Sequence, residues 1–443
     1  MGQVRWASWT VTVATALVIT GGQVARADVA SDKSAAIVIY PEVKVDSSHD
    51  LDTVIRLTNT SNKSIALHCF YLDANSHCVG GTAEGMVCTS GVTAGSSVCT
   101  GGGTCSAVSS LQEIDFDVTM TPNQPLQWLA SEGLEPPIPN GVCSTNPFVP
   151  CNTDADCSLF ANGSKCTPSN SGTNVPGTPE DPFVGELKCI EVNPNSNDVV
   201  PIAANDVKGE ALIEKSTASP ADFDVASYNA VGIEALLQCS GGGNDGGPCK
   251  SNADCAPPEG PAGICQAPPG PIGNVLTLGG NGAEYNGCPN FLILNHFFDF
   301  AADPVPGSSN TITTNLVVVP CSEDLESQIC GEAVLQFLVF NEFESRFSTS
   351  VTANCFLDKQ LSKLTVGDPT KSIWSVSVEG TLTGQTRINP VVNSAFPLPS
   401  GMVGFAYETH TGTNTRSAAF NLHLAGVRAD KSGNPLSDKI TLP

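Results

Sequence analysis

The sequence predicts an all-β protein, and three observations support that prediction. The 443-residue chain contains 42 glycines and 32 prolines, which favour turns between short strands. Only 14% of its residues are charged, too few for the polar faces of many long amphipathic helices. Short apolar runs, some alternating and some continuous, recur between polar or proline-containing turns.

The first 27 residues have the pattern of an export signal. Arg5 supplies a positive charge, residues 11–19 are apolar, and residues 25–27 (ARA) place small residues before a cleavage site. A transmembrane anchor would need about 20 apolar residues, and the polar residues 20–23 end this run too early. We therefore expect a chain with no membrane span that is secreted or on the cell surface, or periplasmic in a bacterium with two membranes.

All 18 cysteines are expected to form disulfides, because an exported chain is oxidised and an even number permits complete pairing. The alternative is zinc, but the sequence has no CxxC pair and its histidines lack zinc-finger spacing. The cysteines are Cys69, Cys78, Cys88, Cys99, Cys105, Cys143, Cys151, Cys157, Cys166, Cys189, Cys239, Cys249, Cys255, Cys265, Cys288, Cys321, Cys330 and Cys355. The histidines are His49, His68, His77, His296, His410 and His423.

The net charge of −24 argues against nucleic acid and anionic lipid as partners. No cofactor is expected, with calcium as the one alternative. Two acidic segments could bind calcium: Asp46, Asp50 and Asp52 around His49, and the pair Asp154 and Asp156. Neither has a twelve-residue calcium-loop signature, and aspartates in turns commonly cap backbone amides, which is the favoured interpretation.

Two regions of the chain share an order of apolar segments, which predicts an internal repeat. In both regions a first strand ends at a proline, a second ends at an asparagine and a third ends in Cys-Phe. The earlier region has segments 37–43 and 52–59 and the pair Cys69-Phe70, followed by 183–192 and 227–235. Their counterparts are 316–322, 335–341 and Cys355-Phe356, followed by 401–408 and 418–426.

This order of strands resembles an immunoglobulin-like β-sandwich. The resemblance implies two tandem related modules, residues 28–310 and 311–443, and implies no function. Residues 53–58 alternate, with Val54 and Arg56 on one face and Ile55 and Leu57 on the other. Residues 291–300 are nearly all apolar and predict a buried strand near the junction of the modules.

Three cysteine-rich stretches are expected to be insertions in the first module, near residues 78–105, 143–166 and 239–265. The last two share a Pro-Cys pair, a five-residue spacer and an Asp-Cys ending, in residues 150–157 and 248–255. They resemble the small cysteine-rich modules of dickkopf type. The stretch 78–105 lacks this ending, so it is either a degenerate copy or pairs differently. With few large apolar residues, all three depend on disulfides, each contributing about 2–4 kcal/mol.

Outside these stretches, we expect Cys69 and Cys189 to bridge two sheets, and Cys321 and Cys330 to close a local loop. Spacing alone does not establish connectivity.

Common catalytic and nucleotide-binding motifs are absent from the sequence. His296 could act as a base near Asp299, but strand alternation puts the two on opposite faces, and a hydrogen-bonded core histidine is favoured. Glu342 and Glu344, two apart, could form the carboxylate pair of a glycosidase. Charged residues at a strand end are more commonly solvated, here beside Arg346.

Trp128 and Trp374 occupy corresponding positions and could stack on sugars if exposed, although burial is favoured. Asn59, Asn62 and Asn162 are in glycosylation sequons.

We therefore expect a non-enzymatic recognition, adhesion or structural protein whose disulfide-bonded loops contact an extracellular protein or glycan. One alternative is a secreted hydrolase near the module junction, using His296 or the Glu342 and Glu344 pair. The other is a carbohydrate-binding module that uses Trp128 or Trp374.

Overall fold

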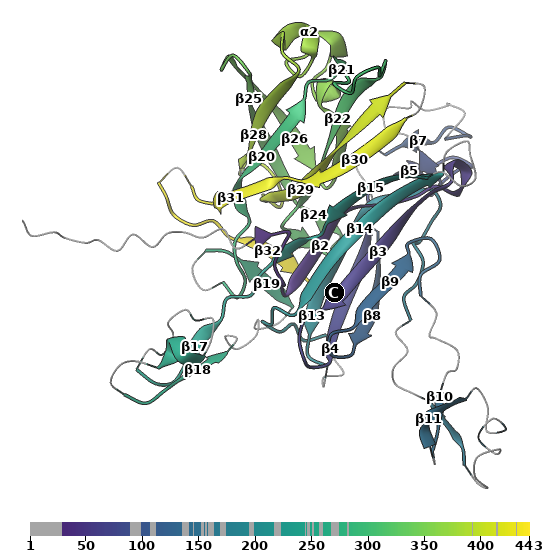
Figure 1. Cartoon of the computed structure of the whole chain (residues 1–443), viewed down its shortest axis with the longest axis vertical. Coiled ribbons are helices and arrows are strands. Elements are labelled where there is room, and N and C mark those ends of the chain that lie inside the picture. The colour runs from purple at the N-terminus through teal and green to yellow at the C-terminus, as the bar shows by residue number, and fades with distance from the viewer. Residues whose placement is uncertain are drawn as a thin grey trace, which may run out of the picture.

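The structure is a computed structural model that describes residues 29–443 except 89–98, 107–111, 135–140, 145, 152–154, 156, 158–163, 169–173, 195–198, 217–222, 244, 246–248, 250–251, 257–259, 267–273, 281–282, 392, 413–414 and 431. The expected export signal lies outside the described residues. The described chain is all-β, as predicted (Figure 1). Its short helical segments are η1 (Ser47–His49), η2 (Asn252–Cys255), η3 (Leu361–Lys363), η4 (Pro369–Lys371) and α2 (Val376–Glu379).

The N-terminal half forms two antiparallel sheets. Sheet S1 has the order β1 (Val29–Ala30), β16 (Val231–Ile233), β2 (Ile37–Val45), β13 (Phe183–Val192), β4 (Ile65–Asp73) and β8 (Glu113–Met120). Sheet S2 has the order β15 (Phe223–Asn229), β14 (Val207–Ser216), β3 (Leu51–Asn59) and β9 (Pro125–Leu129).

The C-terminal half forms two larger sheets and a small one. Sheet S3 has the order β21 (Ala301–Ala302), β22 (Thr311–Pro320), β29 (Met402–Thr411) and β30 (Arg416–Asn421), with β27 (Leu357–Gln360) also on β22. Sheet S4 has the order β26 (Arg346–Asn354), β25 (Glu332–Asn341), β28 (Thr383–Val391), β20 (Pro289–Phe297) and β31 (His423–Val427). Sheet S5 has the order β19 (Val275–Leu278), β32 (Asp438–Thr441), β23 (Glu323–Asp324) and β24 (Ile329–Cys330).

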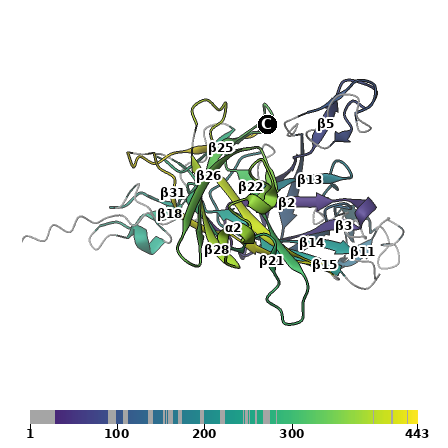
Figure 2. The same ribbon diagram turned by 90° about the horizontal axis from the view of Figure 1, so that it is seen from above.

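Three hydrophobic cores join these sheets, and S1 and S3 are buried on both faces. Val38 and Tyr40 of β2 pack in a core with S2, whereas Ile37 and Ile39 point the other way, into a core with S3 and S5. A third core lies between S3 and S4. Two-sided burial explains why β2 reads as a continuous apolar run instead of an alternating one. Figure 2 shows the strands of S2 and S4 on opposite sides of the view.

Two buried charge clusters cross from the N-terminal to the C-terminal half. In the first, Lys188 of β13 is fully buried, with its Nζ 2.9 Å from Glu186 Oε1 and in contact with Glu323 of β23. In the second, Lys44 Nζ lies 2.7 Å from Glu42 Oε1 and 2.8 Å from Asp358 Oδ2 of β27. Burial raises the pKa of Glu42 and of Glu323 to about 8 in each case.

The predicted alternation of residues 53–58 is confirmed. Ile55 and Leu57 are buried in the core between S1 and S2, and Arg56 points outward, where it pairs with Glu210 at 2.8 Å.

Two predicted strand ends are wrong. Strand β2 continues through Pro41 to Val45. A bulge in β2 places Pro41 and Glu42 opposite Glu186 of β13, so the backbone N–H that proline lacks is not needed for strand pairing there. Cys69-Phe70 lies in the middle of β4, whereas Cys355-Phe356 lies between β26 and β27, beyond a strand end.

The predicted buried strand corresponds to β20 (Pro289–Phe297). It pairs with β28 and β31 in S4, with Leu292 and Leu294 inward. Phe291 and Asn295 are exposed on the other face, so the strand is buried on one face only. The strands of the C-terminal sheets therefore begin before residue 311.

Candidate functional site

Three cysteine-rich hairpins, here called cassettes, share one disulfide connectivity. The first cysteine of each bonds the third and the second bonds the fourth. Cassette 1 contains Cys78–Cys99 and Cys88–Cys105, cassette 2 contains Cys143–Cys157 and Cys151–Cys166, and cassette 3 contains Cys239–Cys255 and Cys249–Cys265. Of the two interpretations left open for residues 78–105, the structure supports a copy of the same frame.

Strand register confirms that the cassettes are alike. The first and fourth cysteines are direct antiparallel partners in all three. These pairs are Cys78 with Cys105, Cys143 with Cys166, and Cys239 with Cys265. The strands that carry them are β5 (Ser76–Val79), β6 (Val87–Cys88), β7 (Thr104–Cys105), β10 (Gly141–Cys143), β11 (Asn146–Cys151), β12 (Cys166–Pro168), β17 (Gln238–Ser240) and β18 (Ile264–Gln266).

Cassettes 1 and 3 also share a glycine pair that the spacing of the cysteines alone did not predict. Gly80 and Gly81 follow Cys78 by two and three residues, as Gly241 and Gly242 follow Cys239. All four have φ between +70° and +78°, a region that favours glycine. The signal was visible in the sequence as Cys-x-Gly-Gly, which begins at the first cysteine of cassettes 1 and 3 and is missing from cassette 2.

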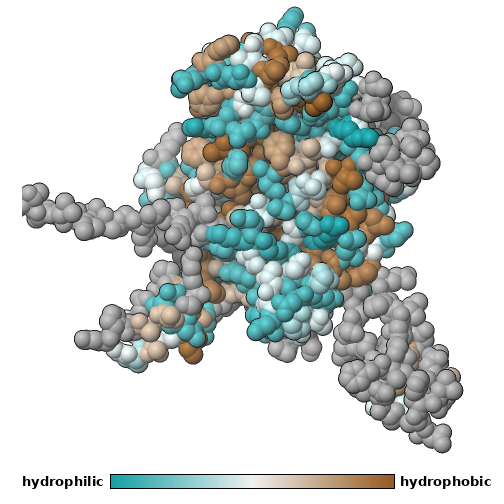
Figure 3. Space-filling view, in the orientation of Figure 1, coloured by the Kyte–Doolittle hydropathy of each residue, from teal (hydrophilic) through white to brown (hydrophobic). Residues whose placement is uncertain are grey.

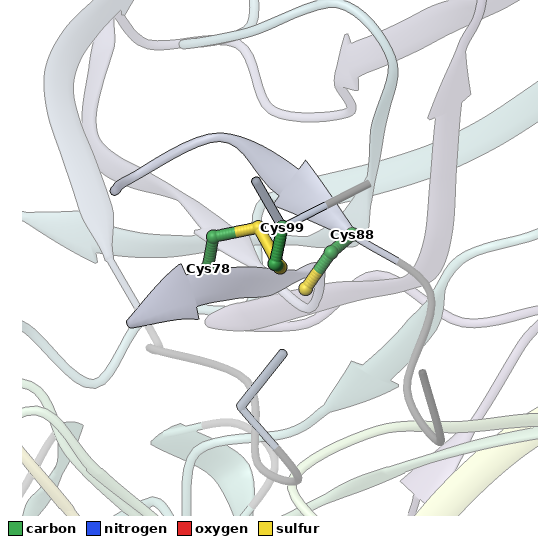
Figure 4. A group of neighbouring side chains, drawn as sticks. All are labelled: Cys78, Cys88 and Cys99. Carbon is green, nitrogen blue, oxygen red and sulfur yellow. A yellow bond between two sulfur atoms is a disulfide. The ribbon is translucent and has the colours of Figure 1, made fainter. Parts of the chain in front are cut away.

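Cystines form the cassette interiors. The buried cluster of cassette 3 consists of Cys239, Cys249 and Cys255, and that of cassette 1 adds only Ala83 to its cysteines. Figure 4 shows the Cys78–Cys99 bond beside the sulfur of Cys88. Although three sulfurs gather in each cassette, they are oxidised and supply no thiolate for zinc.

The described residues of the cassettes include exposed large apolar side chains. Val79 and Met86 of cassette 1 are 58% and 61% exposed, and Ile264 of cassette 3 is 58% exposed. Cassette 3, around β17 and β18, projects from the sheets with a mixed hydrophilic and hydrophobic surface (Figures 1 and 3). These apolar side chains are accessible on the surface of cross-linked hairpins.

The other six cysteines form three disulfides: the pairing of Cys69 with Cys189 was expected, and the other two pairings were not. Cys69 and Cys189 are bonded, but they face each other on adjacent strands β4 and β13 of S1, so the bond joins strands of one sheet and not two sheets. The predicted Cys321–Cys330 loop is wrong: Cys321 bonds Cys288, and Cys330 bonds Cys355. Partners distant in sequence are brought together by strand pairing, which spacing does not reveal.

His296 is a core histidine. It is 4% exposed, its Nε2 lies 2.8 Å from Thr386 Oγ1, and its Nδ1 lies 2.9 Å from the Phe297 carbonyl. Burial lowers its pKa to about 4. Asp299 instead accepts hydrogen bonds from Thr314 and Ser362, so it does not orient this imidazole.

Two glutamates line a cavity of about 470 Å³ at the end of S4 next to α2. Glu342 accepts hydrogen bonds from the Thr383 N–H and hydroxyl, which lower its pKa, whereas burial raises the pKa of Glu408. Glu344 does not line this cavity, and β25 ends at Asn341, so Glu342 and Glu344 do not lie two apart on one strand, as the glycosidase alternative required.

In the acidic segment around His49, aspartates cap backbone N–H groups, which was the interpretation favoured over calcium binding. Asp46 accepts the Ser48 N–H at the start of η1, and Asp52 accepts the N–H groups of Thr53 and Ser131. Asp154 and Asp156 lie outside the described residues.

Both tryptophans are buried. Trp128 donates to the Tyr71 hydroxyl at 2.8 Å, and Trp374 donates to Thr386 Oγ1 at 3.2 Å. Neither can serve as a platform for sugar rings.

The described sequons differ in accessibility. Asn59 is buried and its amide donates to the carbonyl of Lys63, whereas Asn62 is exposed. Asn162 lies outside the described residues.

Comparison with protein-family models, with curated proteins and with solved structures found no match. No helix in the described ranges has the length and apolarity to cross a membrane.

Proposed function

We propose that this is an exported, non-enzymatic recognition or adhesion protein in which two related immunoglobulin-like sandwiches present three cystine-framed hairpins. The observation that carries the proposal is the repeated cassette frame with apolar side chains exposed on it. Nine disulfides are typical of a protein outside the cytoplasm. The expected partner is an extracellular protein or glycan.

Some of the strand arrangement supports related sandwiches. Strands β2 and β13 are antiparallel neighbours in S1, as β22 and β29 are in S3. The proposed counterparts β4 and β26 differ, because β4 lies beside β13 whereas β26 lies beside β25.

The test is a binding array of extracellular proteins and glycans probed with the mature, disulfide-intact chain. A variant with Val79→Ser, Met86→Ser and Ile264→Ser is expected to bind its best ligand at least about tenfold more weakly, because exposed apolar anchors are removed. The matched control is Val366→Ser, an exposed valine outside the cassettes that is expected to leave binding unchanged. The proposal would be contradicted if both variants lost binding equally, or if both bound the ligand as well as the wild type.

We keep a hydrolase as the second candidate, because two carboxyl groups with oppositely shifted pKa values line one cavity, as an acid and base pair requires. A chromogenic glycoside panel tests it. Activity that is lost in both Glu342→Gln and Glu408→Gln would favour the hydrolase, and a wild-type chain without turnover would reject it for those substrates.

A further inference from the structure

Three potential ligand side chains meet where cassette 1 leaves S1. Asp73 is the last residue of β4, His77 lies in β5, and Glu180 precedes β13. One ligand atom from each lies within 4.8 Å of the others. Asp73 and His77 are 1% and 8% exposed, and the Glu180 side chain is 23% exposed.

Both carboxylates face the same imidazole nitrogen. His77 Nε2 lies 3.0 Å from Glu180 Oε2 and 3.4 Å from Asp73 Oδ2. One ring nitrogen donates one hydrogen bond, so the imidazole N–H can satisfy only one of these two carboxylates. Ligand atoms at about 2.0–2.2 Å from a shared metal ion lie roughly 3 to 3.5 Å apart, which matches this spacing.

Asn75 positions the remaining oxygen of each carboxylate. Its backbone N–H donates to Asp73 Oδ1 at 2.8 Å, and its side-chain Nδ2 donates to Glu180 Oε1 at 2.5 Å. These bonds leave Asp73 Oδ2 and Glu180 Oε2 turned toward His77. Hydrogen bonds of this kind orient the ligands of metal sites.

His68 provides an internal contrast. It also contacts two carboxylates, but Asp117 faces its Nδ1 at 2.7 Å and Asp115 faces its Nε2 at 3.4 Å. The two carboxylates lie at different edges of the ring and cannot share one ion with it. Their side chains are 77% and 60% exposed, so water solvates them.

We propose that Asp73, His77 and Glu180 bind a divalent transition-metal ion of the zinc class, with water completing the coordination. A nitrogen with two carboxylate oxygens suits zinc, whereas calcium takes oxygen ligands. Two carboxylates, a neutral imidazole and a divalent cation have no net charge, which favours a partly buried site. The ion joins the end of β4 and the segment before β13 to β5, and so fixes the root of cassette 1 against S1.

The experiment is a zinc titration of the mature, disulfide-intact chain after removal of metals with a chelator, read by calorimetry. We expect a high-affinity site in the wild-type chain. His77→Ala should abolish it, Glu180→Gln should weaken it by about tenfold or more, and Asn75→Ala by about 10- to 100-fold. The matched control, His68→Ala, should bind zinc like the wild type.

A wild-type chain that binds no zinc overturns the proposal, as does a site that survives both His77→Ala and Glu180→Gln. Loss of the site in His68→Ala with retention in His77→Ala also overturns it. Circular dichroism without metal checks that each variant folds. If His77→Ala is unfolded, the zinc affinity of Glu180→Gln tests the proposal instead, because glutamine keeps the shape of this partly exposed side chain. Zinc should then raise the Tm of the wild type and not that of Glu180→Gln.

Discussion

The sheets and the cassettes of this protein are stabilised by different interactions. In the sheets, side chains from distant segments fill three cores, and S1 and S3 are buried on both faces. In the cassettes, the buried clusters consist almost entirely of cystine. The contrast teaches that damage to a core should spread through the sheets, whereas damage to a cystine should remain within its cassette.

The largest effect is expected at the buried cation between the two halves. Lys188→Ala should destabilise the sheets by about 3–5 kcal/mol, because it leaves Glu186 and Glu323 buried without their partner. Urea unfolding followed by the fluorescence of Trp128, in the core between S1 and S2, and of Trp374, in the core between S3 and S4, measures the change. The exposed Lys371→Ala is the control, expected within about 0.5 kcal/mol of the wild type. Equal stabilities of the two variants would refute the assigned role.

A smaller and local effect is expected in cassette 3. Replacing Cys249 and Cys265 with serine should destabilise that cassette by about 2–4 kcal/mol and expose it to protease. Limited proteolysis with mass spectrometry locates the cuts, and tryptophan fluorescence should show an almost unchanged unfolding transition of the sheets. Reductant should likewise expose all cassettes before the sheets unfold. Cassettes that remain uncut after reduction would show that cystines do not hold them.

The pH dependence of the free energy of unfolding is expected to distinguish the sheets, which contain buried carboxyl groups, from the cassettes. Burial raises the pKa of Glu42 from 4.5 to about 8, so the folded chain holds a proton that the unfolded chain releases. This contribution is fully present below pH 4.5 and is lost as pH rises toward about 8. Between these values the free energy of unfolding should fall by up to about 1.4 kcal/mol per pH unit for this group.

Glu42→Gln, which stays neutral, isolates that contribution. Urea unfolding across this pH range should give a shallower slope for the variant than for the wild type. Parallel slopes would mean that Glu42 does not retain its proton in the folded chain.

The smallest effect tests the glycine pair of cassette 1. Both glycines have positive φ, so alanine costs about 1–2 kcal/mol at either position. At Gly81 the added Cβ would also lie 2.4 Å from the Thr100 carbonyl oxygen, whereas at Gly80 it meets open space. Gly81→Ala should therefore be cut faster by protease than Gly80→Ala. Equal cutting rates would indicate that the close approach is relieved without opening the hairpin.

Local patterns in the sequence predicted the all-β class, the core position of His296 and the cassette boundaries, because these depend on neighbouring residues. The partners of Cys321 and Cys330 were missed because they depend on strand pairing over long separations. The Pro41 bulge was missed for the same reason, since only the facing strand β13 accommodates it. The convergence of Asp73 and His77 with Glu180 also requires S1 to form, whereas the glycine pairs were readable from spacing alone.

Two-sided burial of S1 has a consequence for the order in which the chain can fold. Strand β2 is made early, but the core that buries Ile37 and Ile39 includes residues of S3 and S5, and Lys44 pairs with Asp358 across a separation of 314 residues. Contacts this distant in sequence slow folding and leave apolar strands exposed in the meantime. During biogenesis, the segment around β2 is therefore where a chaperone is expected to bind and where aggregation is expected to start.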